Sequence, residues 1–494
     1  MTIAPHSTFE SHNPATGQVL GIYPVQTEID VSSAVERARV ASTPWKSLGF
    51  SGRKKILLAW SKTLIDRIDE CAELISRETG KPISDAKLEA TLAIGHLAWA
   101  ARSAEEILRT EHRRPGLIMA NMSATVTHVP FGVIGVIGPW NYPIFTPMGS
   151  ISYALAAGNT VVFKPSEYTP GVGLWLAETF SEAAESKDFF IAITGLADTG
   201  RALCESGVGK LAFTGSTKTA KKVAETCSRN MTPVVMECGG KDPVLVADDA
   251  DIKTAVEFSL WSAMSNAGQT CIGAERIYVD AKISEEFISL FVAEARKITV
   301  GAPGNANYGP ATMPSQIDVI QSHIADALSR GAEAAVGGLI SIRPPFVEPV
   351  VLLNVPEDSL AMTEETFGPT IAINVVKNMD EAIALSNASR YGLAAAVWSR
   401  KNGEKIAEQL QCGMVSINST ISFAAVASVP FGGVKDSGYG RIHGPEGLLE
   451  FTYPRTIVRA RFKLPLSFTT FKRTAFADKL IVGVVKVLHG RSIG

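Results

Sequence analysis

A thiol, a carboxylate and a side-chain amide stand at three separate points of the chain. The thiol is Cys271, which ends the run Gly268-Gln269-Thr270-Cys271 between a predicted helix and a strand-like segment. The carboxylate is Glu237, which is followed by a pair of glycines, and the amide is Asn141. A lone cysteine is most often a small buried hydrophobe. A thiol together with a base and a hydrogen-bond donor, however, is the set that covalent acyl transfer requires.

Seven short motifs that include these residues resemble those of the aldehyde dehydrogenase superfamily, in the family's order and from about residue 13 to about residue 461. Each motif alone is a weak pattern, whereas seven in order are very specific. The motifs are Gly138–Pro143, Phe163–Glu167, Phe213–Thr217, Glu237–Lys241, Gly268–Cys271, Glu365–Pro369 and Pro430–Gly433.

The resemblance implies oxidation of an aldehyde to the acid with reduction of NAD, through a thiohemiacetal and a thioester on Cys271. Asn141 and a backbone N–H near Cys271 would hold the oxyanion, and Glu237 would activate the water that releases the acid. An ordinary thiol is only a few per cent thiolate at neutral pH, so Cys271 needs local activation. Relatives that acylate coenzyme A generally lack the base, so Glu237 favours hydrolysis. A coenzyme A-acylating relative and a catalytically silent member are the alternatives, and the intact set of three residues argues against silence.

Strands and helices alternate along most of the chain. The run from Gly132 to Gly138 is wholly apolar, as expected for a strand buried in a parallel sheet, and it ends at Trp140. The βαβ rhythm predicts a doubly wound parallel sheet, and its return after Glu237 predicts a second one. The expected fold class is therefore α/β, with two doubly wound Rossmann-like domains and the β oligomerisation arm that the family resemblance implies.

The expected domains follow from these patterns and from the resemblance. Residues 1–117 and 133–238 are expected to form the cofactor-binding domain, and residues 239–436 the catalytic domain. Residues 118–132 and 454–494 are expected to form the arm and a C-terminal tail. In the first domain, helical spacing of apolar residues predicts helices over Val31–Ala41 and Arg53–Thr79.

No clean GxGxxG motif follows a strand, so the cofactor site depends on other residues. Gly215 and Ser216 open a predicted helix directly after a strand, and a helix N-terminus is a ready anion site. By themselves they support phosphate binding only weakly, since many helices begin this way as caps. The resemblance implies that both face the cofactor pyrophosphate. Ala220 departs from the family, because many relatives carry a second glycine there.

Two further pairs and one ring complete the predicted cofactor site. The resemblance implies that Lys164 and Glu167 hold the adenosine ribose, that Glu365 and Phe367 hold the nicotinamide ribose, and that Trp140 belongs to the same site. A carboxylate near the 2′ position accepts a hydroxyl but repels a 2′-phosphate. We therefore expect NAD as the cofactor, with NADP possible because Lys164 offsets part of the repulsion.

The substrate pocket is the least specified part of the site. The resemblance implies that Tyr142, Gly149 and Phe431 border it, with the loop 419–429 completing it. Gly149 stands where many relatives carry a bulky residue, which favours a wider tunnel. Because no arginines cluster in these segments, an apolar or aromatic aldehyde is the expected substrate. Lys241 and Glu275 lie near the motifs without an assigned role.

Composition excludes several other classes of protein. The 494 residues carry a net charge of −2, which gives no global field that favours nucleic acid. The six cysteines form no CxxC pair, which argues against zinc and against a disulfide framework. No metal site is expected, and the cysteine usage fits a reducing cytoplasm. We expect neither a signal peptide nor a membrane-spanning helix.

The C-terminal tail is strongly basic. From Arg455 to Gly494 the chain has nine Lys or Arg and one acidic residue, Asp478. The resemblance implies that 455–461 is a subunit-joining strand and that the protein is a homodimer or homotetramer. Beyond it, residues 462–494 fit either packing on a neighbouring subunit or a basic amphipathic membrane anchor. We favour the subunit interface.

Overall fold

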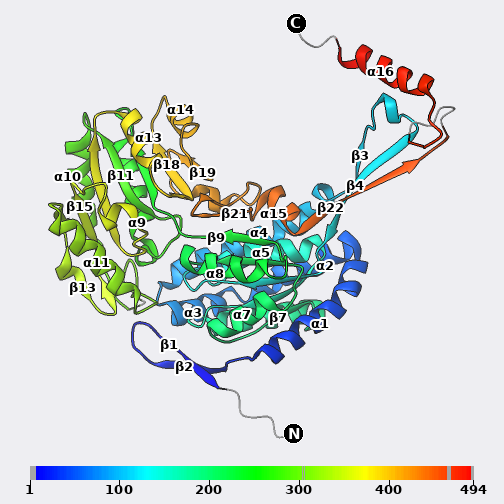
Figure 1. The fold of residues 1–494 in the computed structure, drawn as a ribbon. Coiled ribbons are helices and arrows are strands. Elements are labelled where there is room, and N and C mark those ends of the chain that lie inside the picture. The colour runs from blue at the N-terminus through cyan, green and yellow to red at the C-terminus, as the bar shows by residue number, and fades with distance from the viewer. Residues whose placement is uncertain (1–6, 303, 305, 464–468, 491–494) are drawn as a thin grey trace.

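Two mostly parallel sheets divide the chain between them in a computed structural model that describes residues 7–302, 304, 306–463 and 469–490 (Figure 1). The first sheet has the order β21-β9-β8-β5-β6-β7, and its members are parallel except β21. The bounds are β5 Val133–Ile137, β6 Thr160–Lys164, β7 Phe190–Ala192, β8 Lys210–Thr214, β9 Val234–Glu237 and β21 Gly438–Tyr439.

The second sheet has the order β12-β15-β16-β11-β10-β18-β19, with β12 alone running antiparallel to its neighbour. The expected α/β class with two doubly wound sheets is thus confirmed. The bounds are β10 Asp242–Val246, β11 Ala274–Asp280, β12 Glu333–Val336, β15 Val350–Leu353, β16 Thr370–Val376, β18 Ala394–Trp398 and β19 Met414–Ile417.

Helices cover both faces of each sheet, because strand residues alternate between two apolar cores. In β5, Val133 faces one core and Ile134 the other, and in β10 Val244 and Leu245 divide in the same way. Around the first sheet lie α1 Glu28–Ser47, α2 Gly49–Asp66, α3 Ile68–Thr79, α4 Ile83–Ile107, α5 Phe145–Ala157, α6 Pro170–Ala184, α7 Ala197–Glu205, α8 Thr217–Ser228 and α15 Gly444–Glu450. Around the second lie α9 Ile252–Met264, α10 Ser284–Ala295, α11 Gln316–Ser329, α12 Leu360–Thr363, α13 Met379–Asn387 and α14 Gly403–Ala407.

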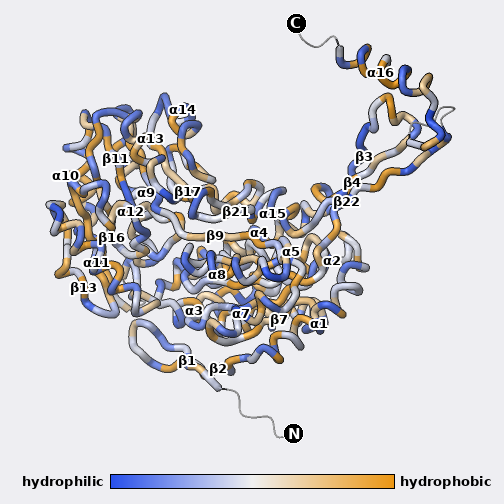
Figure 2. The backbone as a smooth tube through the Cα atoms, in the orientation of Figure 1, coloured by the Kyte–Doolittle hydropathy of each residue, from blue (hydrophilic) through white to orange (hydrophobic). Residues whose placement is uncertain are grey.

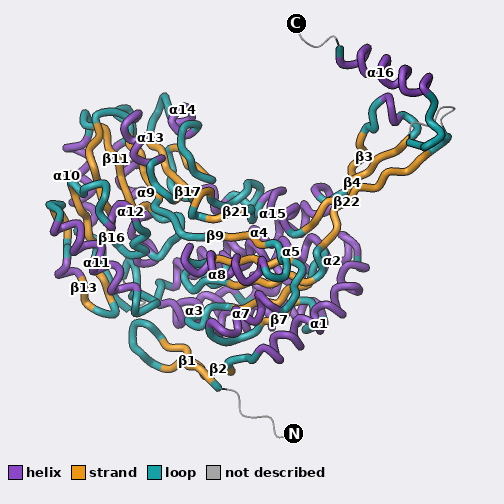
Figure 3. Tube along the Cα trace, viewed as in Figure 1, coloured by secondary structure: helices purple, strands orange, loops and turns teal. Residues whose placement is uncertain are grey.

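The short elements connect these layers (Figure 3). A hairpin precedes α1, and two small strand pairs and four short 3₁₀ segments lie in the loops. They are β1 Thr8–His12, β2 Val19–Pro24, β13 Ile342–Arg343, β14 Phe346–Val347, β17 Tyr391–Gly392, β20 Val434–Lys435, η1 Leu117–Met119, η2 Ser265–Gly268, η3 Leu339–Ser341 and η4 Ser422–Ala425.

The single helix predicted over Arg53–Thr79 is wrong, since two helices meet at Arg67. Arg67 leaves the helical region with φ −111° and ψ 23°. Its guanidinium pairs with Glu70 at 2.7 Å and with Glu182 of α6 at 2.9 Å. The sequence has no Gly or Pro there to signal the break. The almost wholly apolar helix α5 has no polar face, so periodicity did not predict it either.

A three-stranded arm leaves the first unit (Figure 1). It consists of β3 Glu111–Arg113, β4 Met122–Pro130 and β22 Thr452–Ala460, with β4 in the middle. The arm therefore begins before residue 118, the expected boundary, because β3 already pairs with β4. The helix α16 Ala475–His489 follows at the outer end of the arm. No helix in the described part of the chain is long and apolar enough to cross a membrane.

Candidate active site

Cys271 follows a loop whose backbone is left-handed at three consecutive residues. Asn266, Ala267 and Gly268 have φ values of 53°, 57° and 70°. A Cβ at position 268 would lie 2.0 Å from the carbonyl oxygen of Gly368, so only glycine fits there. Non-glycine residues in this region store roughly 1–3 kcal/mol of strain each. The loop therefore needs tertiary contacts to persist.

Gln269 supplies several of those contacts. Its Nε2 donates to the Asn266 carbonyl at 2.8 Å and to the Pro310 carbonyl at 3.3 Å. Its Oε1 accepts the Thr312 N–H at 2.9 Å. The glutamine of the motif that ends in Cys271 thus holds the strained loop, a role that the sequence did not suggest.

Asn141 connects the same loop to the first sheet. Its Nδ2 donates to the carbonyl of Gln269 at 2.9 Å. An amide nitrogen carries two hydrogens, and this bond uses one. Asn141 is not among the described residues that line the cavity, and this bond holds its amide against the backbone two residues before Cys271. The neighbouring Tyr142 reaches the loop as well, through its hydroxyl and Thr270 Oγ1 at 2.9 Å.

A buried ion pair positions the loop that carries Asn141. Lys81 Nζ lies 2.6 Å from Glu89 Oε2 and donates to the Asn141 carbonyl at 2.7 Å. The second carboxylate oxygen of Glu89 accepts the N–H groups of Ile144 and Phe145 at 2.9 and 3.2 Å. Neither residue of the pair was singled out from the sequence, because Lys81 lies in a predicted helix break and Glu89 on a predicted helix, and charges at such positions are normally solvated.

Glu237 ends β9 inside the protein, with 4% of its surface exposed. Neither carboxylate oxygen has a hydrogen-bond partner among the described residues. Burial raises the pKa of this carboxyl well above its ordinary value, the charge of Arg441 opposes the rise and Glu450 adds to it. The carboxyl therefore keeps its proton to higher pH than an exposed glutamate does and is a stronger base once ionised.

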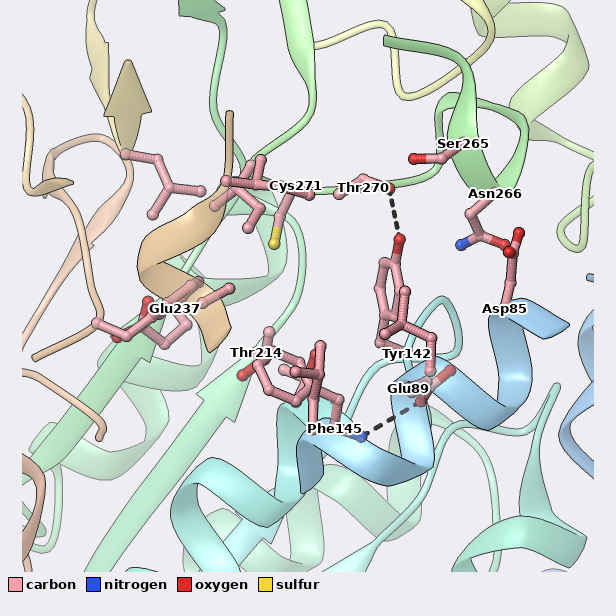
Figure 4. Close-up of a pocket in the computed structure, with 18 of the residues that line it drawn as sticks. Asp85, Glu89, Tyr142, Phe145, Thr214, Glu237, Ser265, Asn266, Thr270 and Cys271 are labelled. Atoms are coloured by element: carbon pink, nitrogen blue, oxygen red, sulfur yellow. Dashed lines mark hydrogen bonds between the residues drawn. The ribbon is translucent and has the colours of Figure 1, made fainter. Parts of the chain in front are cut away.

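Cys271 points its sulfur into the cavity that Glu237 also lines (Figure 4). Burial raises the pKa of the thiol, and the nearby carboxylates of Glu365, Asp242 and Glu237 raise it further. In the protein without bound cofactor or substrate, Cys271 therefore favours the thiol over the thiolate. The two groups line one cavity, although Glu237 ends β9 of the first sheet and Cys271 precedes β11 of the second.

The cavity between these groups contains about 930 Å³ of empty space, counting the part open to solvent. Exposed Leu88 and Trp261 stand on its wall. The described lining includes no arginine, and its one cation, Lys81, is already paired with Glu89. Eight of the remaining lining residues are apolar: Leu92, Phe145, Ile272, Leu393, Ile421, Ala424, Phe431 and Ile442.

Two of the three residues predicted to border the substrate pocket line the cavity. Tyr142 and Phe431 line the cavity, but Gly149 does not, among the residues described. A Cβ on Gly149 would lie 2.5 Å from Nε2 of His443, which fills the space beside the glycine. The expectation that Gly149 widens the tunnel is therefore wrong. His443 stacks near His96, with ring centroids 3.9 Å apart, and was not predicted from the sequence.

Five of the predicted cofactor residues lie at the carboxyl ends of parallel strands of the first sheet, whereas Glu365 and Phe367 lie just before β16 of the second sheet. Lys164 ends β6 with a buried side chain, and its Nζ donates to the Pro165 carbonyl at 3.0 Å. The Glu167 carboxylate lies 4.0 Å from that Nζ and is half-buried. Gly215 and Ser216 link β8 to α8, and the Ser216 hydroxyl caps the helix at the N–H of Thr219.

Glu365 and Phe367 are held by a second buried ion pair. The carboxylate of Glu275 contacts Lys241 closely and accepts the N–H groups of Thr366 and Phe367 at 2.8 and 2.9 Å. Glu365 itself accepts the Gly240 N–H at 3.1 Å. Burial raises the pKa of Glu365 to about 8, and Glu275 contributes to that rise. Lys241 and Glu275 therefore position this segment, and the sequence carried no signal of that role.

The arrangement suits a dinucleotide. A Cβ on Gly239 would meet the Glu365 carboxylate at 2.1 Å, so the glycine is the cradle in which that carboxylate lies. The rings of Trp140 and Phe367 meet edge to face at 5.6 Å. The carboxyl edge of the first sheet carries a cation with a carboxylate and a helix N-terminus, and Glu365 of the second unit adds another carboxylate beside Gly239. These groups suit a ribose, a pyrophosphate and a second ribose. Among the described residues, no cluster of His, Cys, Asp and Glu could hold a metal ion.

The sequence and the fold are similar to those of aldehyde dehydrogenases. The sequence model of the aldehyde dehydrogenase family matches residues 2–457. The 4,4'-diapolycopene aldehyde oxidase of a Methylomonas species is 34% identical over 489 residues, covering 98% of this chain and 92% of that protein. The glutarate-semialdehyde dehydrogenase of Pseudomonas aeruginosa is 36% identical, covering 90% and 93%. The NADP-dependent glyceraldehyde-3-phosphate dehydrogenase structure from Bacillus halodurans superposes with a TM-score of 0.87 at 31% identity, covering 92% and 96%.

The burial of Glu237 predicts a pH-dependent stability difference. A carboxyl with a raised pKa keeps its proton in the folded state after the unfolded state has lost it. Wild-type stability should therefore fall, relative to Glu237→Gln, as pH rises above the ordinary pKa of Glu, by at most about 1.4 kcal/mol per pH unit. Urea unfolding at pH 5 and pH 8 measures this, with the exposed Glu408→Gln as control. A difference between wild type and Glu237→Gln that does not change with pH would contradict the prediction.

Proposed function

The chain belongs to the aldehyde dehydrogenase family, and we propose that it oxidises an uncharged, apolar aldehyde to the free acid through a covalent intermediate on Cys271. It is an NAD(P)-dependent enzyme of the EC 1.2.1 type, as its relatives are. The observation that carries the proposal is one cavity in which Cys271 and Glu237 share an apolar wall without arginine.

In this mechanism the Cys271 thiol first gives up its proton to solvent, the sulfur then attacks the aldehyde carbon, and the carbonyl oxygen becomes an oxyanion. The second amide hydrogen of Asn141 and a backbone N–H of the Cys271 loop hold that oxygen. Losing one such donor typically raises the barrier by about 2.7–4 kcal/mol. The nicotinamide, when bound, supplies the hydride acceptor. Trp140, Lys164, Glu167, Gly215, Ser216, Glu365 and Phe367 would hold the dinucleotide.

Glu237 then serves the release of the acid. Its ionised carboxylate takes a proton from water, which attacks the thioester. The raised pKa makes that carboxylate a stronger base than an exposed one. Hydrolysis, rather than transfer to coenzyme A, is proposed because water needs such a base and a thiol acceptor does not.

The arm supports a proposal about assembly. All residues of β22 after Thr452 are exposed, and the strand forms the edge of the arm sheet. An exposed edge strand presents unpaired backbone groups to another chain. We infer that the arm joins subunits into a homodimer or homotetramer, and that residues 1–110 with 133–238 form the cofactor-binding unit beside the catalytic unit 239–436.

The role of Glu237 in acyl release can be observed directly. The variant Glu237→Gln should form the thioester on Cys271 but hydrolyse it slowly, so the acyl-enzyme accumulates during turnover. Intact-protein mass spectrometry after mixing with aldehyde and NAD detects the added mass. Cys271→Ala is the control and should show neither adduct nor NADH formation. Turnover of Glu237→Gln at the wild-type rate would rule out this base.

The coenzyme preference is proposed to depend on Glu167. Its carboxylate should repel a 2′-phosphate, whereas the Nζ of Lys164 is already hydrogen-bonded to Pro165. We expect kcat/KM to be higher with NAD than with NADP, and Glu167→Gln to narrow the ratio severalfold. Steady-state assays of the wild type and of Glu167→Gln, each with NAD and with NADP, measure this ratio. Glu178→Gln, an exposed glutamate of α6, is the control. An unchanged ratio would place the discrimination elsewhere.

The substrate class follows from charge. Asp85 lines the cavity, and Lys81, the one cation of the described lining, is paired with Glu89, so a carboxylated aldehyde meets a like charge and no free cation. The aldehyde in the name of the Methylomonas relative, 4,4'-diapolycopene aldehyde, suits an apolar wall better than the glutarate semialdehyde in the name of the Pseudomonas relative does. Pentanal should therefore exceed 5-oxopentanoate, its carboxylated counterpart of equal length, in kcat/KM by about tenfold or more, equal to roughly 1.4 kcal/mol.

NADH absorbance with each aldehyde measures that ratio. Asp85→Asn removes one charge from the wall and should narrow the ratio, chiefly through faster turnover of 5-oxopentanoate. A kcat/KM for 5-oxopentanoate that equals or exceeds the value for pentanal would overturn the assigned substrate class while leaving the reaction class intact.

A further inference from the structure

The helix α16 is almost entirely uncovered. It lies at the outer end of the arm, away from both sheets (Figure 1). Of its fifteen residues, Ala477 alone is buried. The match to the family ends at residue 457, so the helix lies outside the part of the chain that the family shares. Its surface is therefore open to a function separate from the catalytic fold.

One side of this helix is continuously apolar. At about 100° per residue the apolar side spans roughly 200° of the helix circumference. Ala477 and the half-buried Ile481 and Val484 face inward, while Phe476 and Val487 are 66% and 76% exposed. Figure 2 shows this mixture of apolar and polar residues along α16. The apolar side consists of Phe476, Ala477, Leu480, Ile481, Gly483, Val484, Val485, Val487 and Leu488.

The opposite side is basic. Lys479 and Lys486 lie on it, beside the exposed Val482. Asp478, the one acidic residue of the helix, pairs with Arg473 at 2.6 Å. Just before the helix, the side chain of Phe471 is fully exposed beside Lys472 and Arg473. Exposed aromatic residues thus alternate with cations on one local surface.

The charge of the chain is divided between the tail and the body. Residues 455–494 carry nine Lys or Arg and one Asp, whereas the whole chain has a net charge of −2. The rest of the protein is therefore acidic. An anionic surface would attract the tail and repel the body, and the arm keeps the two apart.

From these observations we propose that α16 and the Phe471 turn bind an anionic lipid surface, with the helix lying in the plane of the headgroups. Helices of this type carry Lys or Arg on the polar side and Phe or Leu on the other. Protein interfaces are depleted in lysine, which argues against a second copy as the occupant. Since no described helix can span a membrane, the contact is peripheral. This contact replaces the subunit interface that the sequence alone favoured for the tail.

Vesicle flotation of the full-length protein tests the proposal. Binding is expected to vesicles of equal parts phosphatidylserine and phosphatidylcholine, with loss at high salt, and not to phosphatidylcholine alone. A chain ending after Phe462 should no longer bind but should keep its light-scattering mass and its aldehyde oxidation.

Point variants distinguish the electrostatic contact of the lysines from the insertion of the phenylalanines. Lys479→Gln with Lys486→Gln should weaken binding at low salt by about fivefold for each lysine. Phe471→Ser with Phe476→Ser should weaken it at both low and high salt, because insertion of apolar side chains is not screened. Lys54→Gln with Lys55→Gln, a pair of exposed lysines on α2, is the matched control and should bind like wild type.

Three outcomes would overturn the proposal. The first is that the full-length protein fails to float with anionic vesicles. The second is that the tail variants bind as wild type does. The third is a smaller particle on truncation without vesicle binding by either protein, which would assign α16 to a second copy of the chain. None of these outcomes depends on the aldehyde that the enzyme oxidises.

Discussion

The left-handed backbone of the loop before Cys271 is the constraint on which the site depends. Asn266 and Ala267 do not adopt such a conformation without support, because their Cβ atoms crowd the following carbonyl. The support is a chain of contacts that runs through both units. Asn141 binds the loop from the first unit, and the buried pair Lys81 and Glu89 holds the segment that carries Asn141. The nucleophile is therefore in place only when the two units are packed together.

Removal of water is the second influence on the chemistry. The same burial that surrounds Glu237, Cys271 and Glu365 with protein raises the pKa of each. The buried lysines Lys81 and Lys241 lie in contact with carboxylates and take part in holding loops. The site thus contains two kinds of buried ionisable group, ion pairs and unpaired acids. Paired ions hold loops in position, and the unpaired acids keep their protons to higher pH than exposed acids do.

The cavity and the tail share one property, which is apolar surface. The wall around Cys271 offers no free cation to an anionic substrate, and α16 presents a broad apolar side to its surroundings. Apolar aldehydes concentrate in lipid rather than in water. An enzyme held at a lipid surface by its arm would meet such substrates where they dissolve, while its acidic body stays clear of the headgroups.

The sequence by itself determined the family, the α/β class, the NAD(P)-dependent reaction and the motifs from which Cys271 and Glu237 were predicted as partners. These conclusions rest on local spacing, which motifs and strand patterns report directly. Tertiary structure alone decided the break at Arg67, the buried helix α5 and the space beside Gly149 that His443 fills. It also decided the roles of Lys81 with Glu89 and of Lys241 with Glu275. The physical reason is that these features depend on contacts between segments far apart in the chain, and a residue's own sequence context does not reveal which distant carboxylate or ring will meet it.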